Sequence, residues 1–175
     1  MSESKVRLSH YDGRWRQEYE QMRSCLLDAC EGMVTAVEHI GSTVLPSAIA
    51  RPQVDLLAGV ADEVDVSEAL GLIEGLNFRV LNRPNWFADE GSHFLQKTMA
   101  KTPSFNVVLT TNKGPLWYRL MRMKLWLDTH PHDLQRLVQV KIHLIHSSNE
   151  VGSYERGKSI FFTALEDQMD AAGGK

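Results

Sequence analysis

Apolar and polar residues recur with two different periods along this chain. Apolar side chains return every three or four residues between Gly13 and Glu31, a spacing that predicts an amphipathic helix. Short β-branched apolar runs follow at 34–40 and 54–60, and each predicts a buried strand. The same patterns then predict a helix over about 65–76 and strands at 78–81, 93–99 and 105–111.

The chain becomes helical from Pro115 onward. Pro115 suits a first helical turn, and the apolar spacing that begins there continues until His130-Pro131 stops it. Two more helices are predicted, over about 132–146 and 153–171. This order of elements predicts an α/β (α+β) fold, a mixed sheet flanked by helices with a helical C-terminal part.

We expect one domain over the 175 residues, with a cleft between its two parts. Residues 1–112 would form the mixed-sheet core and residues 113–175 the helical part. An interface of this kind is a usual place for a ligand.

The segment from 37 to 60 joins two apolar runs through a polar turn. Gly41 breaks the first run, and Ser42 or Thr43 can cap the helix that we expect to follow. Backbone N–H groups and hydroxyls at such a turn suit the phosphates of a nucleotide. Asp55 lies near the start of the second run, where a carboxylate among apolar residues needs a partner. An aspartate at this place can hold Mg²⁺ against those phosphates.

This segment resembles the GrpB family, a small group with a nucleotidyltransferase-like fold. The resemblance is carried by the string EHIGST at 38–43, then Pro46, Arg51, Pro52 and Asp55. Weaker similarities extend it over nearly the whole chain, at Tyr11, Asp12, Trp15, His130, Pro131, Lys141, Tyr154 and Lys158. The superfamily signature is a Gly-Ser or Gly-Gly turn, a spacer, and Asp-x-Asp or Asp-x-Glu on a strand. Here twelve residues separate Ser42 from Asp55, and Leu57 stands where the second carboxylate belongs.

The resemblance implies a nucleotidyltransferase-type core, a small helical subdomain and a role for each matching residue. Asp55 is the expected catalytic residue and a ligand of Mg²⁺, with Glu38 as a second metal ligand. The expected nucleotide-binding residues are Gly41, Ser42, Thr43, Arg51, Lys141 and Lys158.

Each of these residues also has a possible structural role. Asp55 can accept hydrogen bonds from a loop or pair with Arg51, and Glu38 can face solvent or pair with a basic residue. The Gly-Ser-Thr turn can be an ordinary helix cap, and the two lysines can be solvated. His39 can fix the turn through a hydrogen bond or act as a general base.

Two other regions bear on the chemistry. Trp86 and Phe87 can stack a nucleotide base or plug the edge of the core. Where many relatives have a His-rich strand, this chain has an apolar run ending at Val108. A later segment carries Lys124 and Leu125 in place of Arg and Asp, and lysine cannot reproduce a bidentate arginine contact.

Composition narrows the classes of partner. The 19 basic and 22 acidic residues give a net charge of −3, which disfavours polynucleotides and anionic membranes as partners. No apolar stretch is long enough to span a bilayer, and Cys25 and Cys30 are expected to stay reduced. We therefore expect a cytoplasmic protein with a small-molecule or nucleotide ligand.

Two functions remain open at this point. One is an enzyme that transfers a nucleotidyl or phosphoryl group to a small molecule with Mg²⁺ bound at Asp55. The other is a nucleotide- or anion-binding accessory protein without chemistry. The missing second carboxylate at Leu57 and the substitutions at Val108, Lys124 and Leu125 favour the second function.

Overall fold

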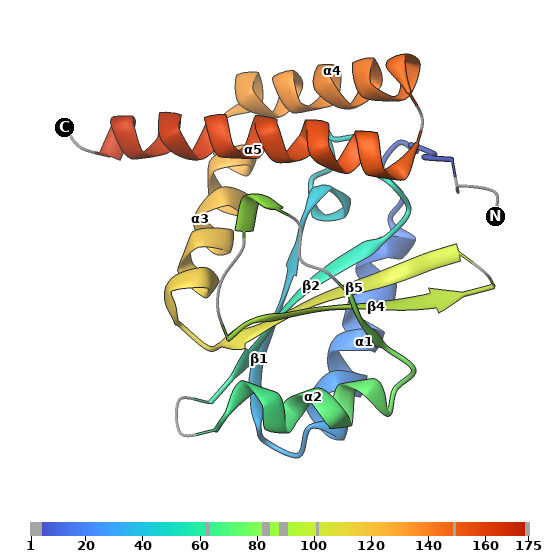
Figure 1. Ribbon diagram of the computed structural model, residues 1–175, viewed down its shortest axis with the longest axis vertical. Coiled ribbons are helices and arrows are strands. Elements are labelled where there is room, and N and C mark those ends of the chain that lie inside the picture. Colours follow the sequence, from blue (N-terminus) through green and yellow to red (C-terminus); the bar gives the residue numbers. More distant parts are fainter. Residues whose placement is uncertain are drawn as a thin grey trace.

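A mixed sheet with helices on both faces organises the chain (Figure 1). The computed structural model describes residues 5–61, 64–81, 85–87, 91–100, 102–148 and 150–173. Within these residues, five strands form one sheet in the order β1-β2-β5-β4-β3. The strands are β1 (Val34–Ile40), β2 (Val54–Val60), β3 (Arg79–Leu81), β4 (His93–Met99) and β5 (Thr102–Thr111). Strands β2 and β5 run parallel, and the other neighbours are antiparallel.

One face of the sheet is covered by α1 (Arg14–Ala29) and α2 (Val66–Glu74). Alternate residues of the strands point to this face, where they pack against the apolar side of each helix. The helix α2 begins at Asp65, whose carboxylate accepts a hydrogen bond of 2.8 Å from the backbone N–H of Ser67. The largest apolar core of the protein lies here, and Leu26, Leu56 and Ile73 are fully buried in it.

The opposite face meets the C-terminal helices. Helix α3 (Pro115–Thr129) packs on β1 and β5, while α4 (Pro131–Ser147) and α5 (Val151–Gly173) lie side by side beyond the sheet (Figure 1). The three helices share an apolar cluster with two residues of the β1–β2 connection, Leu45 and Ala48. The connection between β1 and β2 is therefore held between the sheet and the helical part.

These elements confirm the predicted fold class. β5 begins at Thr102, earlier than the predicted residue 105, because its pairing with β4 continues to Met99 opposite Thr102. The N-terminal arm makes isolated bridges, Lys5 with Glu150 and Ser9 with Ala50. Parts of the predicted loop at 82–91, namely 82–84 and 88–90, lie outside the described residues. The division at residue 112 stays a prediction.

Two predictions from composition can be compared with the structure. Cys25 is exposed and Cys30 buried, and both are free thiols. Within the described residues, no helix has the length and apolar character needed to cross a membrane.

Candidate functional site

Strand register gathers the polar residues of the sheet on the face opposite α1. Asp55 lies opposite Ile40 of β1 on one side and Asn106 of β5 on the other, and Gln96 of β4 follows Asn106. In the next row on the same face, Leu57 lies between Glu38 of β1 and Val108 of β5. Asp55 is thus the single carboxylate that β2 and β5 present to the C-terminal helices.

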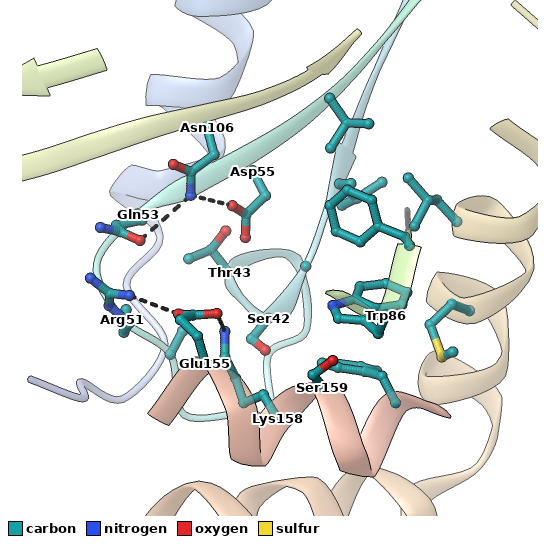
Figure 2. Close-up of a pocket in the computed structure, with 18 of the residues that line it drawn as sticks. Ser42, Thr43, Arg51, Gln53, Asp55, Trp86, Asn106, Glu155, Lys158 and Ser159 are labelled. Atoms are coloured by element: carbon teal, nitrogen blue, oxygen red, sulfur yellow. Dashed lines mark hydrogen bonds and ion pairs between the residues drawn. The ribbon is translucent and has the colours of Figure 1, made fainter. Parts of the chain in front are cut away.

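A chain of hydrogen bonds fixes the Asp55 carboxylate. The amide of Gln96 donates to Asn106 Oδ1 over 2.9 Å. The Asn106 amide donates in turn to Asp55 Oδ1 over 2.7 Å (Figure 2). Burial raises the pKa of the Asp55 carboxyl, while the Asn106 hydrogen bond and the nearby Lys158 oppose that rise. Asp55 accepts from Asn106, and Arg51 pairs with Glu155, so the alternative in which Asp55 pairs with Arg51 is wrong.

Gly41 brings the turn against this carboxylate. Its backbone angles, φ 75° and ψ −168°, lie in a region that is essentially restricted to glycine. A Cβ placed on Gly41 would lie 2.3 Å from Asp55 Oδ2, so only a hydrogen atom fits there. The turn and the strand carboxylate are in direct contact as a result.

The helix expected after Gly41 is only a 3₁₀ turn, Ser42–Val44, and neither hydroxyl caps it. Pro46 explains the short turn, because a proline disfavours helical angles at the residue before it. Leu45 accordingly has extended angles, φ −100° and ψ 108°. The prediction of a capped α-helix is wrong, and a single turn offers no helix dipole to a phosphate.

The side chain of His39 is hydrogen-bonded to the turn that follows Gly41. Its Nε2 lies 2.9 Å from Thr43 Oγ1, and its ring stacks on Tyr19 with centroids 4.8 Å apart. Burial lowers the pKa of His39 to about 4, helped by the charge of Lys124. These contacts confirm the hydrogen-bonding role predicted for His39.

We expect acid to remove the stabilising contribution of His39. With a folded-state pKa of about 4 against 6.5 when unfolded, the folded protein binds fewer protons between these values. This contribution is fully present above pH 6.5, falls with pH, and is lost by pH 4. The loss should be about 3 kcal/mol. Urea unfolding at pH 4 and pH 7 measures it, and the difference should shrink in His39→Gln but not in the exposed His146→Gln control.

Three basic side chains surround the turn. Lys141 of α4 is buried and donates hydrogen bonds to Ser42 Oγ and, over 2.8 Å, to the carbonyl oxygen of Ile49. Burial lowers the pKa of Lys141 to about 7, and the neighbouring charge of Lys158 adds to this effect. Lys141 therefore joins the helical part to the turn, and because it is buried, the alternative of a solvated lysine is wrong at this position.

Glu155 of α5 forms ion pairs with the other two basic side chains, Arg51 and Lys158. Arg51 Nη1 lies 2.9 Å from Glu155 Oε1, and Lys158 Nζ lies 3.0 Å from Glu155 Oε2 (Figure 2). The Lys158 ammonium also stands 4.9 Å from the centre of the Tyr154 ring. A carboxylate of the protein is thus already paired with Arg51 and Lys158, two of the cations that were expected to bind phosphate.

A cavity of about 540 Å³ connects these groups, a size typical of small-molecule sites. Its polar end holds the turn, Asp55 and the Glu155 cluster, and its other end lies beside Trp86 (Figure 2). Its described lining includes five basic and two acidic side chains, although the whole chain carries a net charge of −3. These charged residues are Arg51, Lys124, Lys141, Arg156, Lys158, Asp55 and Glu155.

Comparison with known proteins identifies the family. The sequence profile described as GrpB protein matches residues 5–168. The chain belongs to the GrpB family. The UPF0157 protein SCO7215 of Streptomyces coelicolor is 33% identical over 171 residues, covering 95% of this chain and 86% of the relative. The UPF0157 protein BH1888 of Halalkalibacterium halodurans is 26% identical over 170 residues, covering 95% and 83%.

Solved structures agree with this assignment at the level of the fold. The conserved protein GrpB from Enterococcus faecalis superposes with a TM-score of 0.73 at 20% identity, covering 93% of this chain and 99% of that one. A Cid1 poly(U) polymerase structure with Mg 3′-dATP bound gives a TM-score of 0.53 at 14% identity. That alignment covers 77% of this chain and 42% of the polymerase. The GrpB-family chain therefore has a nucleotidyltransferase-like fold, and the likeness to the polymerase extends no further than the fold.

The donor set of this GrpB-family chain does not fit a divalent metal. Glu38, the expected second ligand, lies 3.8 Å from Lys124 Nζ and does not line the cavity. Asn106 donates its amide toward Asp55, and Leu57 is fully buried among apolar residues. In the part of the chain that the structure describes, no three His, Cys, Asp or Glu residues gather as metal ligands. Magnesium generally needs more oxygen ligands than Asp55 alone provides.

Lys124 and Leu125, two residues at which this chain departs from the family pattern, lie in different surroundings. Lys124 lines the cavity, whereas Leu125 is 62% exposed and lies outside its lining. The helical period of α3 explains the difference, since adjacent residues of a helix point in different directions. The missing carboxylate at Leu125 therefore leaves the cavity unchanged.

Sequence reasoning missed Glu155, Gln96 and Gln53, whose Oε1 accepts a second, longer hydrogen bond of 3.5 Å from the Asn106 amide (Figure 2). Asn106 offered a signal, because an amide inside an apolar strand needs a partner just as Asp55 does. Glu155 offered none, since a glutamate in a helix normally faces solvent. Its role depends on Arg51, which is 104 residues away in the sequence.

Proposed function

We propose that the cleft binds a phosphate-bearing small molecule and does not transfer a nucleotidyl group. The observation that carries this proposal is the gathering of Arg51, Lys141 and Lys158 around the Ser42 turn, opposite the lone strand carboxylate. Arginine and lysine groups of this kind form charge-assisted hydrogen bonds with phosphate oxygens.

Local charge supports binding of an anion. Five basic against two acidic side chains line the described cavity, so its potential differs in sign from the net charge of the chain. Lys141, with a pKa of about 7, carries its charge only part of the time at neutral pH. Arg51 and Lys158 are therefore the main cations for a bound phosphate.

The residues beside Asp55 on the sheet support ligand binding without nucleotidyl transfer. Transfer of a nucleotidyl group relies on cations that neutralise charge as it develops on the phosphate oxygens. A metal in that role needs carboxylates at adjacent strand positions, where this chain has Leu57 and Asn106 beside Asp55. Asp55 is then best suited to accept a hydrogen bond from the ligand or to keep the turn in place.

Metal-dependent nucleotidyl transfer is the second candidate function. The nucleotidyltransferase-like fold and the contact between Asp55 and the Gly41 turn favour it. It predicts that nucleotide binding needs Mg²⁺ and that pyrophosphate is released. We keep Mg²⁺ as a variable of the experiment for this reason.

Isothermal titration with inorganic pyrophosphate and with ATP, GTP, CTP and UTP tests the proposal, each with and without Mg²⁺. We expect saturable binding of pyrophosphate that does not require the metal. Lys158→Met should weaken it about tenfold by removing a phosphate contact. Glu155→Gln should strengthen it about tenfold, because Arg51 and Lys158 lose their internal competitor; exposure of the Glu155 side chain limits the gain.

Asp170→Asn is the matched control for Glu155→Gln. Asp170 also lies on α5 and also pairs with an arginine, Arg122, but it lies outside the cavity lining. It should leave pyrophosphate affinity unchanged. Absence of binding to every phosphate probe would contradict the proposal, and release of pyrophosphate from a nucleotide would replace it with the second candidate.

A further inference from the structure

The end of the cavity away from Arg51, beside Trp86, is lined mostly by apolar side chains (Figure 2). The sheet, the 3₁₀ turn η2 (Asn85–Phe87), helix α3 and helix α5 each contribute such side chains, among them Phe94, Trp86, Met123 and Phe162. Two polar side chains, Lys124 of α3 and Ser159 of α5, also line it. Such a surface favours an apolar group over a polar one.

The strand position where a metal-dependent enzyme of this fold would carry its second carboxylate lies behind this apolar end. Leu57 and Val108 are neighbours across β2 and β5, and both belong to one cluster with Ile40, Phe87 and Leu120. Val108 lines the cavity, whereas Leu57 is fully buried and packs behind the lining. Leu57 therefore supports the apolar wall and adds no polar group to it.

A nucleotide base would find few partners at this end. The aromatic rings there already contact one another, since Trp86 stacks on Phe162 with centroids 4.6 Å apart. Of the polar side chains near it, Gln96 already donates to Asn106, and Lys124 lies 3.8 Å from Glu38 Oε2. A base would leave several of its own donors and acceptors unpaired, which costs free energy in a closed site.

We propose that the ligand is a phosphate ester of an apolar alcohol, alkyl or aryl. Its phosphate would lie at Arg51 and Lys158, and its apolar body would lie against Trp86, Met123 and Phe162. This inference rests on the proposed function for the phosphate end and adds the chemical class of the remainder. The two cations paired with Glu155 lie at one end of the cavity and most of the apolar lining lies at the other, and the ligand should show the same separation.

Titration of the full chain with methyl, butyl and hexyl phosphate tests the inference, with AMP for comparison. Each buried methylene should strengthen binding about fourfold, in line with its free energy of transfer from water. Hexyl phosphate should bind at least tenfold more tightly than AMP. Met123→Gln should reduce the dependence on chain length and leave methyl phosphate affinity unchanged, whereas Met99→Gln, on an exposed methionine, should change neither.

The outcomes separate the two proposals. If methyl phosphate binds and lengthening the chain adds no affinity, or AMP binds more tightly than hexyl phosphate, the inference is wrong and the proposed function stands. If no phosphate probe binds, both are wrong. The series on the unmodified chain decides the matter even if Met123→Gln proves unstable.

Discussion

Gly41→Ala should lower the free energy of unfolding by about 4 kcal/mol and abolish phosphate binding. Two effects act together at this position. The backbone angles of Gly41 are strained for any residue with a Cβ, and that Cβ would lie 2.3 Å from Asp55 Oδ2. Either the turn or β2 must move, and both carry the binding groups. Urea unfolding and pyrophosphate titration measure the two losses.

Gly32→Ala separates strain from collision. Gly32 also has a positive φ, +86°, but a Cβ there meets nothing within 4 Å. Its substitution should cost about 1–2 kcal/mol from backbone strain alone and leave binding intact. Equal losses in the two variants would show that contact with Asp55 has no special weight.

Asn106→Asp should also destabilise the protein, by about 4 kcal/mol at pH 8. The amide that donates to Asp55 over 2.7 Å would become a second carboxylate at the same distance. Two like charges in a half-buried site repel, and the Gln96 amide can satisfy only one oxygen. Urea unfolding without divalent ions measures the loss.

Manganese or magnesium should reverse this loss in Asn106→Asp. Two adjacent carboxylates form the pair that such ions bind, and an ion bound only by the folded state raises its stability. The parent chain should show little response to millimolar Mn²⁺. Asn112→Asp, near the other end of β5, should not be rescued. Strong stabilisation of the parent chain by Mn²⁺ would contradict the conclusion that the side chains around Asp55 do not fit a divalent metal.

Local pattern was sufficient for the elements of the fold. The bounds of β1, β2 and α3 match those predicted, because burial of one face imposes the period of a strand or a helix on the sequence itself. Positions 41 and 55 were also predictable, since a glycine that ends an apolar run and a carboxylate that begins another are conspicuous.

The turn after Gly41 marks where local reasoning was incomplete. Its hydroxyls suggested a helix cap, but Pro46 limits the helix to one turn. The proline was visible in the sequence. Whether the proline or the capping hydroxyls would decide the length of the helix depended on tertiary packing. Leu45 and Ala48 pack against the C-terminal helices in the conformation that the proline favours.

The sequence by itself therefore determined the secondary structure, the family and the position of the lone carboxylate. Tertiary structure alone decided two partners: Asn106 rather than Arg51 for Asp55, and Glu155 for Arg51. These two contacts join residues 51 and 104 positions apart, whereas Lys158 and Glu155 are three apart on one helix. Side-chain charge and hydrogen-bonding capacity are local properties, but which groups meet depends on strand order and on the docking of α5, and no short-range pattern encodes either.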